Sequence, residues 1–399
     1  MLQTSVQLYR NAYRGLPRKI WWLSLVMLVN RAGTMVIPFL TLYLTDKGFT
    51  LTQAGYAMAA FGVGAIAGGF LGGKLTDRFG FFYVQAQSLF SNGIMFFVLA
   101  QMQTLPQIIV CIFILSTLGE SFRPANAAAI AHYSNETNRM RCYSLNRLAI
   151  NLGWAIGPAV GGLLSQISYD WLFWADGSTC IFAAFILFFI HSPQEKLKTV
   201  HKAGFVKRGS AFKDFIFLKG MFLVFLSAIC FFQLFSIVSF FYEEVLHLSK
   251  FTIGCLLAMN GLVIFLIEMV LVYKLDGRYN PFNYIIGGTF LIGASFLTLN
   301  IAPLLSVAII SMLIITVGEM LLFPFINNFW VKRSNEQNRG QYASVYTMAF
   351  AAAHVVAPTF SSAIAYNLGF SWLWIINFAI CSLAMTGFIF LKRSIKKNE

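Results

Sequence analysis

The six residues SNETNR at positions 134–139 return as SNEQNR at positions 334–339, 200 residues further along the chain. A repeat at this distance predicts that the chain consists of two similar halves. We expect a first half at 1–191 and a second at 218–399, joined by a linker at 192–217 that is rich in Lys and Arg. Further pairs with an offset of 199 or 200 are Glu120 and Glu319, Pro158 and Pro358, and Trp174 and Trp374.

The composition excludes a water-soluble protein. Hydrophobic residues make up 58% of the 399 residues and charged residues only 11%, whereas soluble domains carry roughly 25% charged residues. Disordered, collagen-like and disulfide-rich secreted proteins are excluded on the same grounds. The six cysteines lie in or beside apolar runs without C-x-x-C spacing, so we expect them to be packing residues that form neither disulfides nor a metal site.

A helix needs about 20 apolar residues to cross a bilayer, and twelve stretches of the sequence satisfy this requirement. The sequence therefore predicts an all-α membrane protein with twelve transmembrane helices in two six-helix halves related by pseudo-twofold symmetry. The expected spans are 20–44, 54–73, 81–102, 105–132, 143–166, 170–191, 218–242, 252–273, 281–302, 304–331, 341–366 and 370–391.

The net charge of +14 indicates the orientation of these spans. With both termini in the cytoplasm, 24 of the 29 Lys and Arg residues fall on that side, while Lys47 and Lys250 fall outside. This distribution follows the positive-inside rule. We therefore interpret the basic residues as a topology signal and a contact with anionic lipid head groups, and we expect no binding to nucleic acid. The first apolar run is longer than the core of a signal peptide, so we expect it to be retained.

Ionisable residues within the spans are functional candidates because burying a charge in lipid is costly. Arg31 lies in the first span, and Glu120 and Arg123 lie three residues apart in the fourth, which places them on one helix face. In the second half Glu319 repeats Glu120, but Phe323 takes the place of Arg123. The remaining candidates are Glu268, His354 and Asp176, the last of which we expect near the outer membrane interface.

From this arrangement we predict that Glu120 alternates between an ion pair with Arg123 or Arg31 and a protonated state. A gate that wets and dries the pair changes its affinity for protons, so a proton serves as coupling ion without any cofactor. The alternatives are a permanent structural ion pair, and proton transfer by Glu319 or Glu268. His354 is either a packed neutral side chain or a titrating one.

Aromatic and amide side chains are expected to line a solute cavity. Phe-rich walls suit a bulky, partly apolar solute, although such residues also fill cores and face lipid. The candidates are Asn30, Asn151, Phe232, Gln233, Asn260, Asn327 and Asn328.

Two halves in the same orientation are one of the known designs of secondary transporters. The chain has no phosphate-binding G-x-x-x-x-G-K-[ST] loop, which argues against ATP-driven transport. It also lacks H-E-x-x-H and G-x-S-x-G motifs, and the segments between spans are too short for a catalytic domain, so we do not expect an enzyme.

Two motifs carry a resemblance to the major facilitator superfamily. The loop GKLTDRFG at 73–80 resembles the family's G-x-L-x-D-R-x-G signature, and the span-5 stretch GWAIGPAVGG at 153–162 is similar to the G-x-x-x-G-P-x-x-G-G motif of the drug:proton antiporter branch. Phe81 and Phe82 stand where the family pattern continues with two basic residues. A weaker likeness to proton-coupled peptide transporters is carried by Arg123-Pro124 and Asn151-Leu152-Gly153. The matching positions are Gly73, Asp77, Arg78 and Gly80 for gating, and Gly153, Gly157, Pro158, Gly161 and Gly162 in span 5.

The resemblance implies alternating-access transport, with proton-coupled export of amphipathic small molecules as the first expectation. A proton-coupled symporter that imports a peptide or sugar-like nutrient is the alternative, and a non-transporting sensor of the same fold is a third. We expect a monomer in the bacterial inner membrane whose partners are a small solute and lipid.

Overall fold

The computed structural model describes residues 15–135, 138–190, 211–275, 277–334 and 339–398. All regular secondary structure in these ranges is helical, as predicted. Eleven of the described segments are long and apolar enough to cross a membrane. The expected span at 281–302 corresponds to helix α13 (Pro281–Thr298), whose 18 residues extend about 27 Å at 1.5 Å per residue, close to the thickness of a bilayer core.

The helices group into two compact units. Unit 1 comprises Met1–Val36 and Gly64–Val200, and unit 2 comprises Ile37–Val63 and His201–Glu399. Residues 37–63 therefore group with the C-terminal helices, whereas the sequence repeat assigns them to the first half. The division at 1–191, 192–217 and 218–399 stays a prediction, and most of the expected linker lies outside the described residues.

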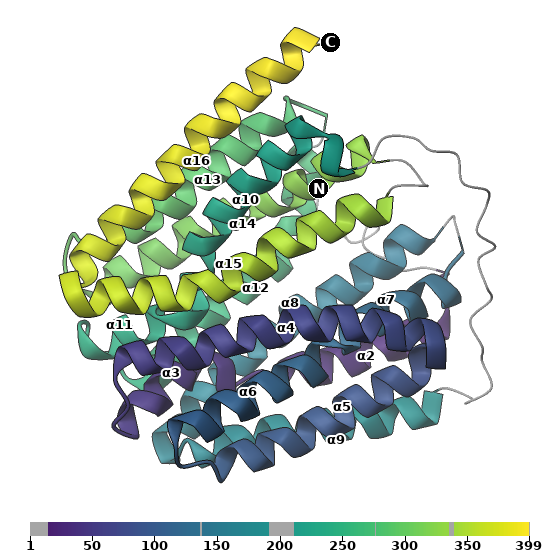
Figure 1. The fold of residues 1–399 in the computed structure, drawn as a ribbon, viewed down its shortest axis with the longest axis vertical. Coiled ribbons are helices and arrows are strands. Elements are labelled where there is room, and N and C mark those ends of the chain that lie inside the picture. The colour runs from purple at the N-terminus through teal and green to yellow at the C-terminus, as the bar shows by residue number, and fades with distance from the viewer. Residues whose placement is uncertain (1–14, 136–137, 191–210, 276, 335–338, 399) are drawn as a thin grey trace, which may run out of the picture. The chain divides into compact units, whose positions relative to one another are not determined.

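In unit 1 the helix α2 packs on α8 and α9, and α5 packs on α6 and α9 (Figure 1). Gly80 lies between α4 and α5 with φ +87°, a conformation that glycine adopts without strain. The helices are α2 (Arg18–Ala32), the second part of α4 (Leu51–Phe79), α5 (Phe81–Ala100), α6 (Leu105–Glu120), α7 (Phe122–Tyr133), α8 (Arg139–Ile167) and α9 (Asp170–Ile190).

Unit 2 repeats this packing at the sequence offset: α10 packs on α15 and α16, and α13 packs on α14 and α16. The internal repeat is thus visible in the contacts of each unit taken separately. The elements are α3 (Val36–Asp46), the first part of α4, the short 3₁₀ helix η1 (Ala211–Lys213), α10 (Phe215–Ser236), α11 (Val238–Glu244), α12 (Lys250–Leu275), α13, α14 (Leu305–Arg333), α15 (Arg339–Leu368) and α16 (Phe370–Asn398).

Three of the expected spans are interrupted helices, and proline explains two of the interruptions. Pro38 has no N–H and cannot bond the carbonyl of Thr34, so span 1 breaks between α2 and α3. Pro124 likewise leaves the carbonyl of Glu120 without its helical donor, and span 4 breaks between α6 and α7. Span 7 breaks at Ile237, between α10 and α11. The first spans of the two halves, 1 and 7, are therefore broken at similar positions.

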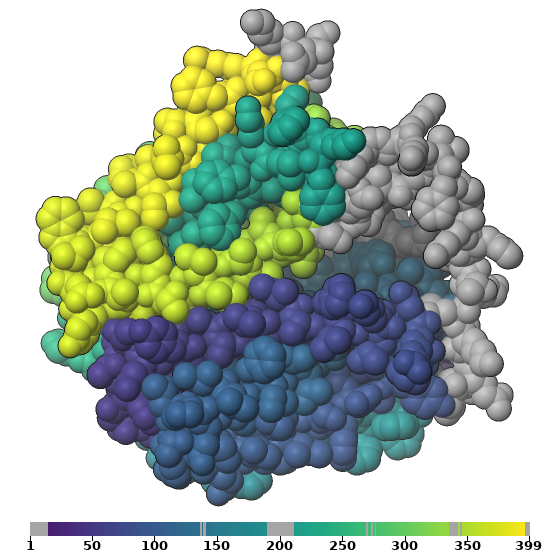
Figure 2. Space-filling view, viewed as in Figure 1, coloured from purple at the N-terminus to yellow at the C-terminus, as the bar shows by residue number. Residues whose placement is uncertain are grey.

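The outward faces of the long helices are apolar, as lipid requires. On α16, which lies at the surface (Figure 2), Trp372, Ile375, Leu383 and Phe390 are all exposed. Large exposed apolar side chains of this kind mark a surface that contacts a membrane or another protein. All six cysteines are free, and five of them are buried, in agreement with their predicted role in packing.

Asp214 connects three helices at one end of unit 2. Its carboxylate caps α10 by accepting the backbone N–H of Phe217, and it accepts two hydrogen bonds from the Arg333 guanidinium at 2.8 and 2.9 Å and one from the Tyr342 hydroxyl at 2.9 Å. Burial favours the neutral acid, but the hydrogen bonds from Arg333, Phe217 and Tyr342 outweigh it and lower the pKa of Asp214. Burial and the bond to Asp214 raise the pKa of Tyr342 to about 12.

We expect Asp214→Asn to lower the free energy of unfolding by about 1–3 kcal/mol at neutral pH, because it removes charge-assisted hydrogen bonds. Since the folded pKa is lowered, the wild-type advantage is present above the unfolded pKa of about 4 and is lost as the pH falls through the folded pKa. Thermal unfolding of wild type and variant in detergent across this range tests the prediction, with the exposed Asp170→Asn as control. A difference that does not shrink on acidification contradicts it.

Candidate functional site

Glu120 and Arg123 face each other across the break in span 4. Arg123 Nε lies 2.7 Å from Glu120 Oε2, and the side chains are 64% and 14% exposed. The structure thus brings together the pair that the i, i+3 spacing predicted. Because Pro124 interrupts the helix beside it, the ion pair lies where the backbone of span 4 has lost a hydrogen bond.

Arg31 of α2 belongs to the same cluster. It interacts electrostatically with Arg123, Glu120 and Cys180. Its Nε is buried and has no hydrogen-bond partner in the described part of the chain. Glu120 therefore has one guanidinium in ion-pair contact, that of Arg123, and a second, that of Arg31, close enough to interact electrostatically.

The span-5 glycines allow α8 to approach the end of α2. A Cβ atom on Gly153 would lie 2.4 Å from Arg31 Cβ, and one on Gly157 would lie 2.8 Å from the carbonyl oxygen of Thr34. Pro158 lies within continuous α8, and Gly161 and Gly162 are buried in the same helix. Close approach of helices through small residues is the expected use of this motif.

The gating motif at 73–80 forms the end of α4 and the turn that follows. Asp77 and Arg78 are exposed, and no ion pair joins them within the described residues. The Arg78 guanidinium instead lies 5.1 Å from the centre of the Phe79 ring, and Gly73 has open space around it. The gating role that the resemblance implies for this motif stays a prediction.

In unit 2 the carboxylate of Glu319 lies within a small polar group. The side-chain amide of Asn260 donates to Glu319 Oε2 at 3.3 Å and to the Thr316 hydroxyl at 3.0 Å. Thr316 is buried and Glu319 is half-buried. Glu268 is buried about two turns further along α12 from Asn260.

An aromatic wall adjoins this group, formed by rings from α10, α14 and α15. Phe323 follows Glu319 by four residues on α14 and therefore lies on the same helix face. It contacts Phe231 at 4.8 Å and Phe350 at 5.5 Å between ring centres. We define the aromatic wall as Phe231, Phe232, Phe323, Trp330, Tyr346 and Phe350, which are linked by ring contacts of 4.8–6.1 Å.

His354 of α15 extends the aromatic wall. Its ring lies 4.3 Å from Phe232 and 5.5 Å from Phe61. The carbonyl that Pro358 leaves without a helical donor belongs to His354, and a Cβ on Gly62 would lie 2.9 Å from that oxygen. These ring contacts indicate a packed histidine.

Among the amides expected to line a cavity, Gln233 has a different position from the one expected. It is fully buried and exchanges two hydrogen bonds of 2.7 Å with Asn377, so it is part of the core of unit 2. Asn30 donates to the sulfur of Cys180 at 3.4 Å. Asn327 is exposed, whereas Asn151 and Asn328 are half-buried.

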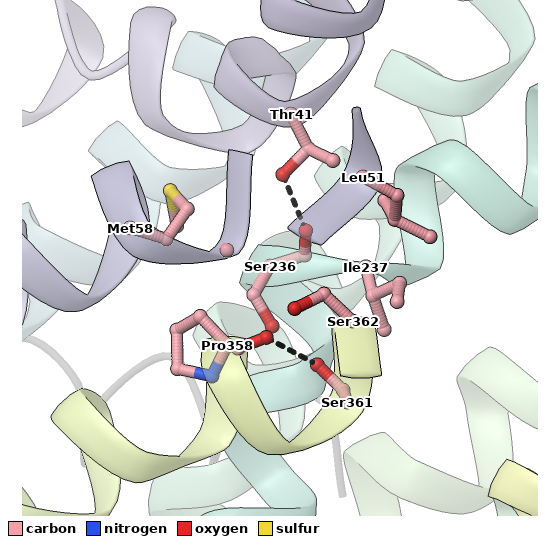
Figure 3. Close-up of a pocket in the computed structure, with 9 residues that line it drawn as sticks. Thr41, Leu51, Met58, Ser236, Ile237, Pro358, Ser361 and Ser362 are labelled. Atoms are coloured by element: carbon pink, nitrogen blue, oxygen red, sulfur yellow. Dashed lines mark hydrogen bonds between the residues drawn. The ribbon is translucent and has the colours of Figure 1, made fainter. Parts of the chain in front are cut away.

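A narrow gap within unit 2 is lined by residues of α3, α4, α10 and α15 (Figure 3). It is too narrow for a water molecule and therefore for a solute. The Thr41 hydroxyl donates to the Ser236 carbonyl at 2.6 Å at the break in span 7, and a Cβ on Gly55 would lie 2.2 Å from Ser362 Oγ. We interpret it as a tight helix contact made by small residues.

The sequence matches the profile of the Major Facilitator Superfamily over residues 23–358. The chain belongs to this superfamily. It is 23% identical over 398 residues to a Na⁺, Li⁺, K⁺/H⁺ antiporter of Planococcus maritimus, with 91% of this chain and 92% of the relative covered. It is also 25% identical over 162 residues to the quinolone resistance protein NorA of Staphylococcus aureus, with 40% and 42% covered.

Solved transporters of known fold share this architecture. The nucleoside transporter NupG superposes with a TM-score of 0.80 over 94% of this chain and 100% of its own, at 12% identity. A POT family transporter in complex with 5-aminolevulinic acid gives 0.78 over 95% and 96%, at 16% identity. The protein is therefore a multi-pass membrane transporter of small solutes, and its relatives are not enzymes.

Sequence reasoning about this superfamily member missed two contacts. The expected position of Asp176 near the outer interface stays a prediction, but its burial, with 1% of the residue exposed, and its bonds to the backbone of span 1 were not foreseen. Asn377, the partner of Gln233, was not considered. The signal for the first was a Gly-Thr pair and Pro38 within span 1, which predicts a helix break whose amides need an acceptor.

Proposed function

We propose that this transporter exports amphipathic aromatic cations in exchange for protons, by alternating access. The observation that carries the proposal is the unequal distribution of charge between the two units. Unit 1 holds Arg31 and Arg123 around Glu120, whereas unit 2 holds Glu319 on the helix face that also presents Phe323.

The aromatic wall and Glu319 support the proposed substrate class. Aromatic ring faces attract organic cations and also bury the apolar surface of a flat solute. A carboxylate four residues from Phe323 adds an opposite charge to that surface. The partial similarity to a quinolone resistance protein is consistent with a planar, amphipathic solute.

The Glu120–Arg123 pair supports coupling to protons. In the ion pair Glu120 is charged, and it is only 14% exposed. Any movement at the α6–α7 break that separates it from Arg123 favours uptake of a proton. When Glu120 and Arg123 form the ion pair again, Glu120 releases this proton. The relative from Planococcus maritimus is named a cation/H⁺ antiporter, which is consistent with exchange.

The remaining properties follow the sequence expectations. We propose that both termini lie in the cytoplasm of a bacterial inner membrane, because 24 of 29 Lys and Arg residues then lie inside. The basic segments contact anionic lipid head groups and not nucleic acid. The proton is the coupling ion, no other cofactor takes part, and the monomer is the working unit.

Proteoliposomes that contain the purified chain and a pH-sensitive dye in the lumen test the proposal. We expect ethidium, tetraphenylphosphonium and norfloxacin to accumulate when the lumen is acidic, and each solute to move opposite to the proton. The physical reason is that exchange links the two fluxes with opposite sign.

Protein-free vesicles and a neutral sugar serve as controls for leakage and for solute class. Protons that move in the same direction as a peptide or sugar would establish the symporter alternative. Binding of a probe without flux under any gradient would establish a sensor. Absence of exchange with all three aromatic probes contradicts the proposed substrate class.

A further inference from the structure

Asp176 is a buried carboxylate that binds the backbone of another helix. It is 1% exposed, and it accepts the N–H of Met35 at 2.9 and 3.2 Å and the N–H of Val36 at 3.0 Å. No ion pair with Asp176 occurs in the described ranges. A buried charge of this kind is costly unless it is well bonded, so its free energy depends on these two amides.

The two amides are those at the break in span 1. Val36 is the first residue of α3, and amides at a helix N-terminus lack intrahelical acceptors. An anion there also interacts favourably with the helix dipole. The division between the two compact units falls directly after Val36. Asp176 therefore binds the backbone of span 1 at the residue where the chain passes from one unit to the other.

The break in span 1 is closely packed against α8 on one side and α9 on the other. From α8, Gly157 approaches the carbonyl of Thr34, and from α9 Thr179 fills the space beside Gly33, where a Cβ would lie 1.8 Å from the Thr179 hydroxyl oxygen. Because Asp176 is 1% exposed and the break is closely packed, we expect water and protons to reach the carboxylate when the break moves. Binding of a proton and movement of the break are consequently linked.

The sequence repeat supplies a natural comparison. Asn30 and Cys180, which are in contact in unit 1, correspond in sequence to Cys230 and Cys381 in unit 2. There the Cys230 thiol donates to the backbone carbonyl of Asn377 at 3.6 Å. On the last helix of each half the buried positions correspond at an offset of 201 residues, one more than the offset that pairs Trp174 with Trp374. Cys180 then corresponds to Cys381, and Asp176 corresponds to Asn377. Asn377 holds Gln233, just before the break in span 7, through neutral amide bonds.

Unit 2 thus holds its broken span through a neutral side-chain pair, whereas unit 1 uses a carboxylate that accepts backbone N–H groups directly. The carboxylate differs from the amide in one chemical property that matters here: it can bind a proton. A metal ion does not fit the site, because both oxygens face N–H donors, and no group of three His, Cys, Asp or Glu residues in the described chain could hold one.

The surroundings contain few other groups that titrate. On α9 these are Cys180, one turn from Asp176, and Asp170 at the helix start. On α2 the charged neighbour is Arg31, which interacts with Cys180. From α5 the neighbouring polar side chain is Asn92, a donor to Cys180. On α8 the charged residues are Arg139, Arg141 and Arg147, about three turns from Gly157 at the nearest, and on α3 the one acid is Asp46 at its far end.

We propose that Asp176 is a proton-binding site that controls the break in span 1. As a carboxylate it accepts the amides of Met35 and Val36 and holds the start of α3. When it binds a proton, one oxygen becomes a hydroxyl, the bonds to the two amides weaken, and the break loosens. This role is separate from solute exchange and holds whether or not the proposed substrate class is correct.

Hydrogen exchange of the peptide 33–40, measured by mass spectrometry on the detergent-purified full chain, tests the proposal without any solute. After correction for the intrinsic exchange rates, we expect protection to fall by at least about tenfold between about pH 9 and about pH 5, the effect of losing a charge-assisted hydrogen bond. Asp176→Asn should show the lower protection at both values. The control Asp170→Asn should behave as wild type.

A second variant guards against misfolding. Asp176→Glu keeps an acid at the site and should restore a pH-dependent protection of the same peptide. In infrared difference spectra between the same pH values, the band of protonated carboxylic acids should be weaker in Asp176→Asn than in wild type by the contribution of one acid, whereas Asp170→Asn should not remove that contribution. Equal protection of the wild-type peptide at both pH values, or a pH dependence that persists in Asp176→Asn, would overturn the proposal.

Discussion

Glu120→Gln is expected to reduce proton-driven solute transport at least about tenfold, the scale expected when a group that transfers a proton is lost. Glutamine keeps the shape of the side chain and can still accept a hydrogen bond from Arg123, but it cannot bind a proton. Accumulation of ethidium against its gradient in vesicles with an acidic lumen is the measurement. Exchange of labelled for unlabelled ethidium without a pH gradient should continue, because it needs no net proton movement.

The folded state should tolerate this change. The ion pair has one partner that is 64% exposed, and pairs with an exposed partner contribute only about 0–1 kcal/mol, so the thermal unfolding of Glu120→Gln should stay close to wild type. Asp170→Asn is the matched control for removal of an acid in the same unit. If the pH-dependent flux of Glu120→Gln equals that of wild type, the coupling role of Glu120 is wrong, and Glu319→Gln becomes the variant that must lose it.

Removal of Glu120, Glu319 or Asp176 should produce three different experimental effects. Loss of Glu120 should uncouple transport from protons, and loss of Glu319 should weaken binding of cationic solutes to the aromatic wall. Loss of Asp176 should change the stability of the break in span 1 even when no solute is present. A single acid that produced all three effects would mean that binding and coupling are performed by one site.

Most of the fold could be predicted from the sequence because lipid imposes strong constraints on helices. Spans of about 20 apolar residues were sufficient to predict the helices, and the offset of 199–200 residues predicted which helices of the two halves resemble each other. The ion pair of Glu120 and Arg123 was predictable because it is local, three residues apart on one helix face.

The contacts that escaped prediction join distant parts of the chain. Asp176 lies 140 residues from Val36, and Gln233 lies 144 residues from Asn377. Their partners depend on how broken helices pack, and hydrophobic periodicity carries no information about that packing. The assignment of Gln233 to a cavity failed for this reason: its polarity suggested water, but a buried amide of matching geometry satisfies it.

Gly157→Ala is expected to destabilise the protein by about 1–3 kcal/mol, the usual cost of forcing an atom into a close contact. The added Cβ would lie 2.8 Å from the backbone oxygen of Thr34, and a backbone atom in a packed helix cannot rotate away as a side chain can. Gly69→Ala is the matched control, because Gly69 lies within a helix of the same unit with open space around it.

The two alanine substitutions should change the stability of the protein in opposite directions. Alanine favours a helix over glycine by up to about 1 kcal/mol, so Gly69→Ala should leave thermal unfolding unchanged or raise its midpoint, whereas Gly157→Ala should lower it. Equal shifts in both variants would show that α8 does not approach the end of α2 as closely as the structure indicates. Because Gly157 contacts the same break that Asp176 caps from α9, its variant should also reduce the protection of peptide 33–40 at every pH, without removing its pH dependence.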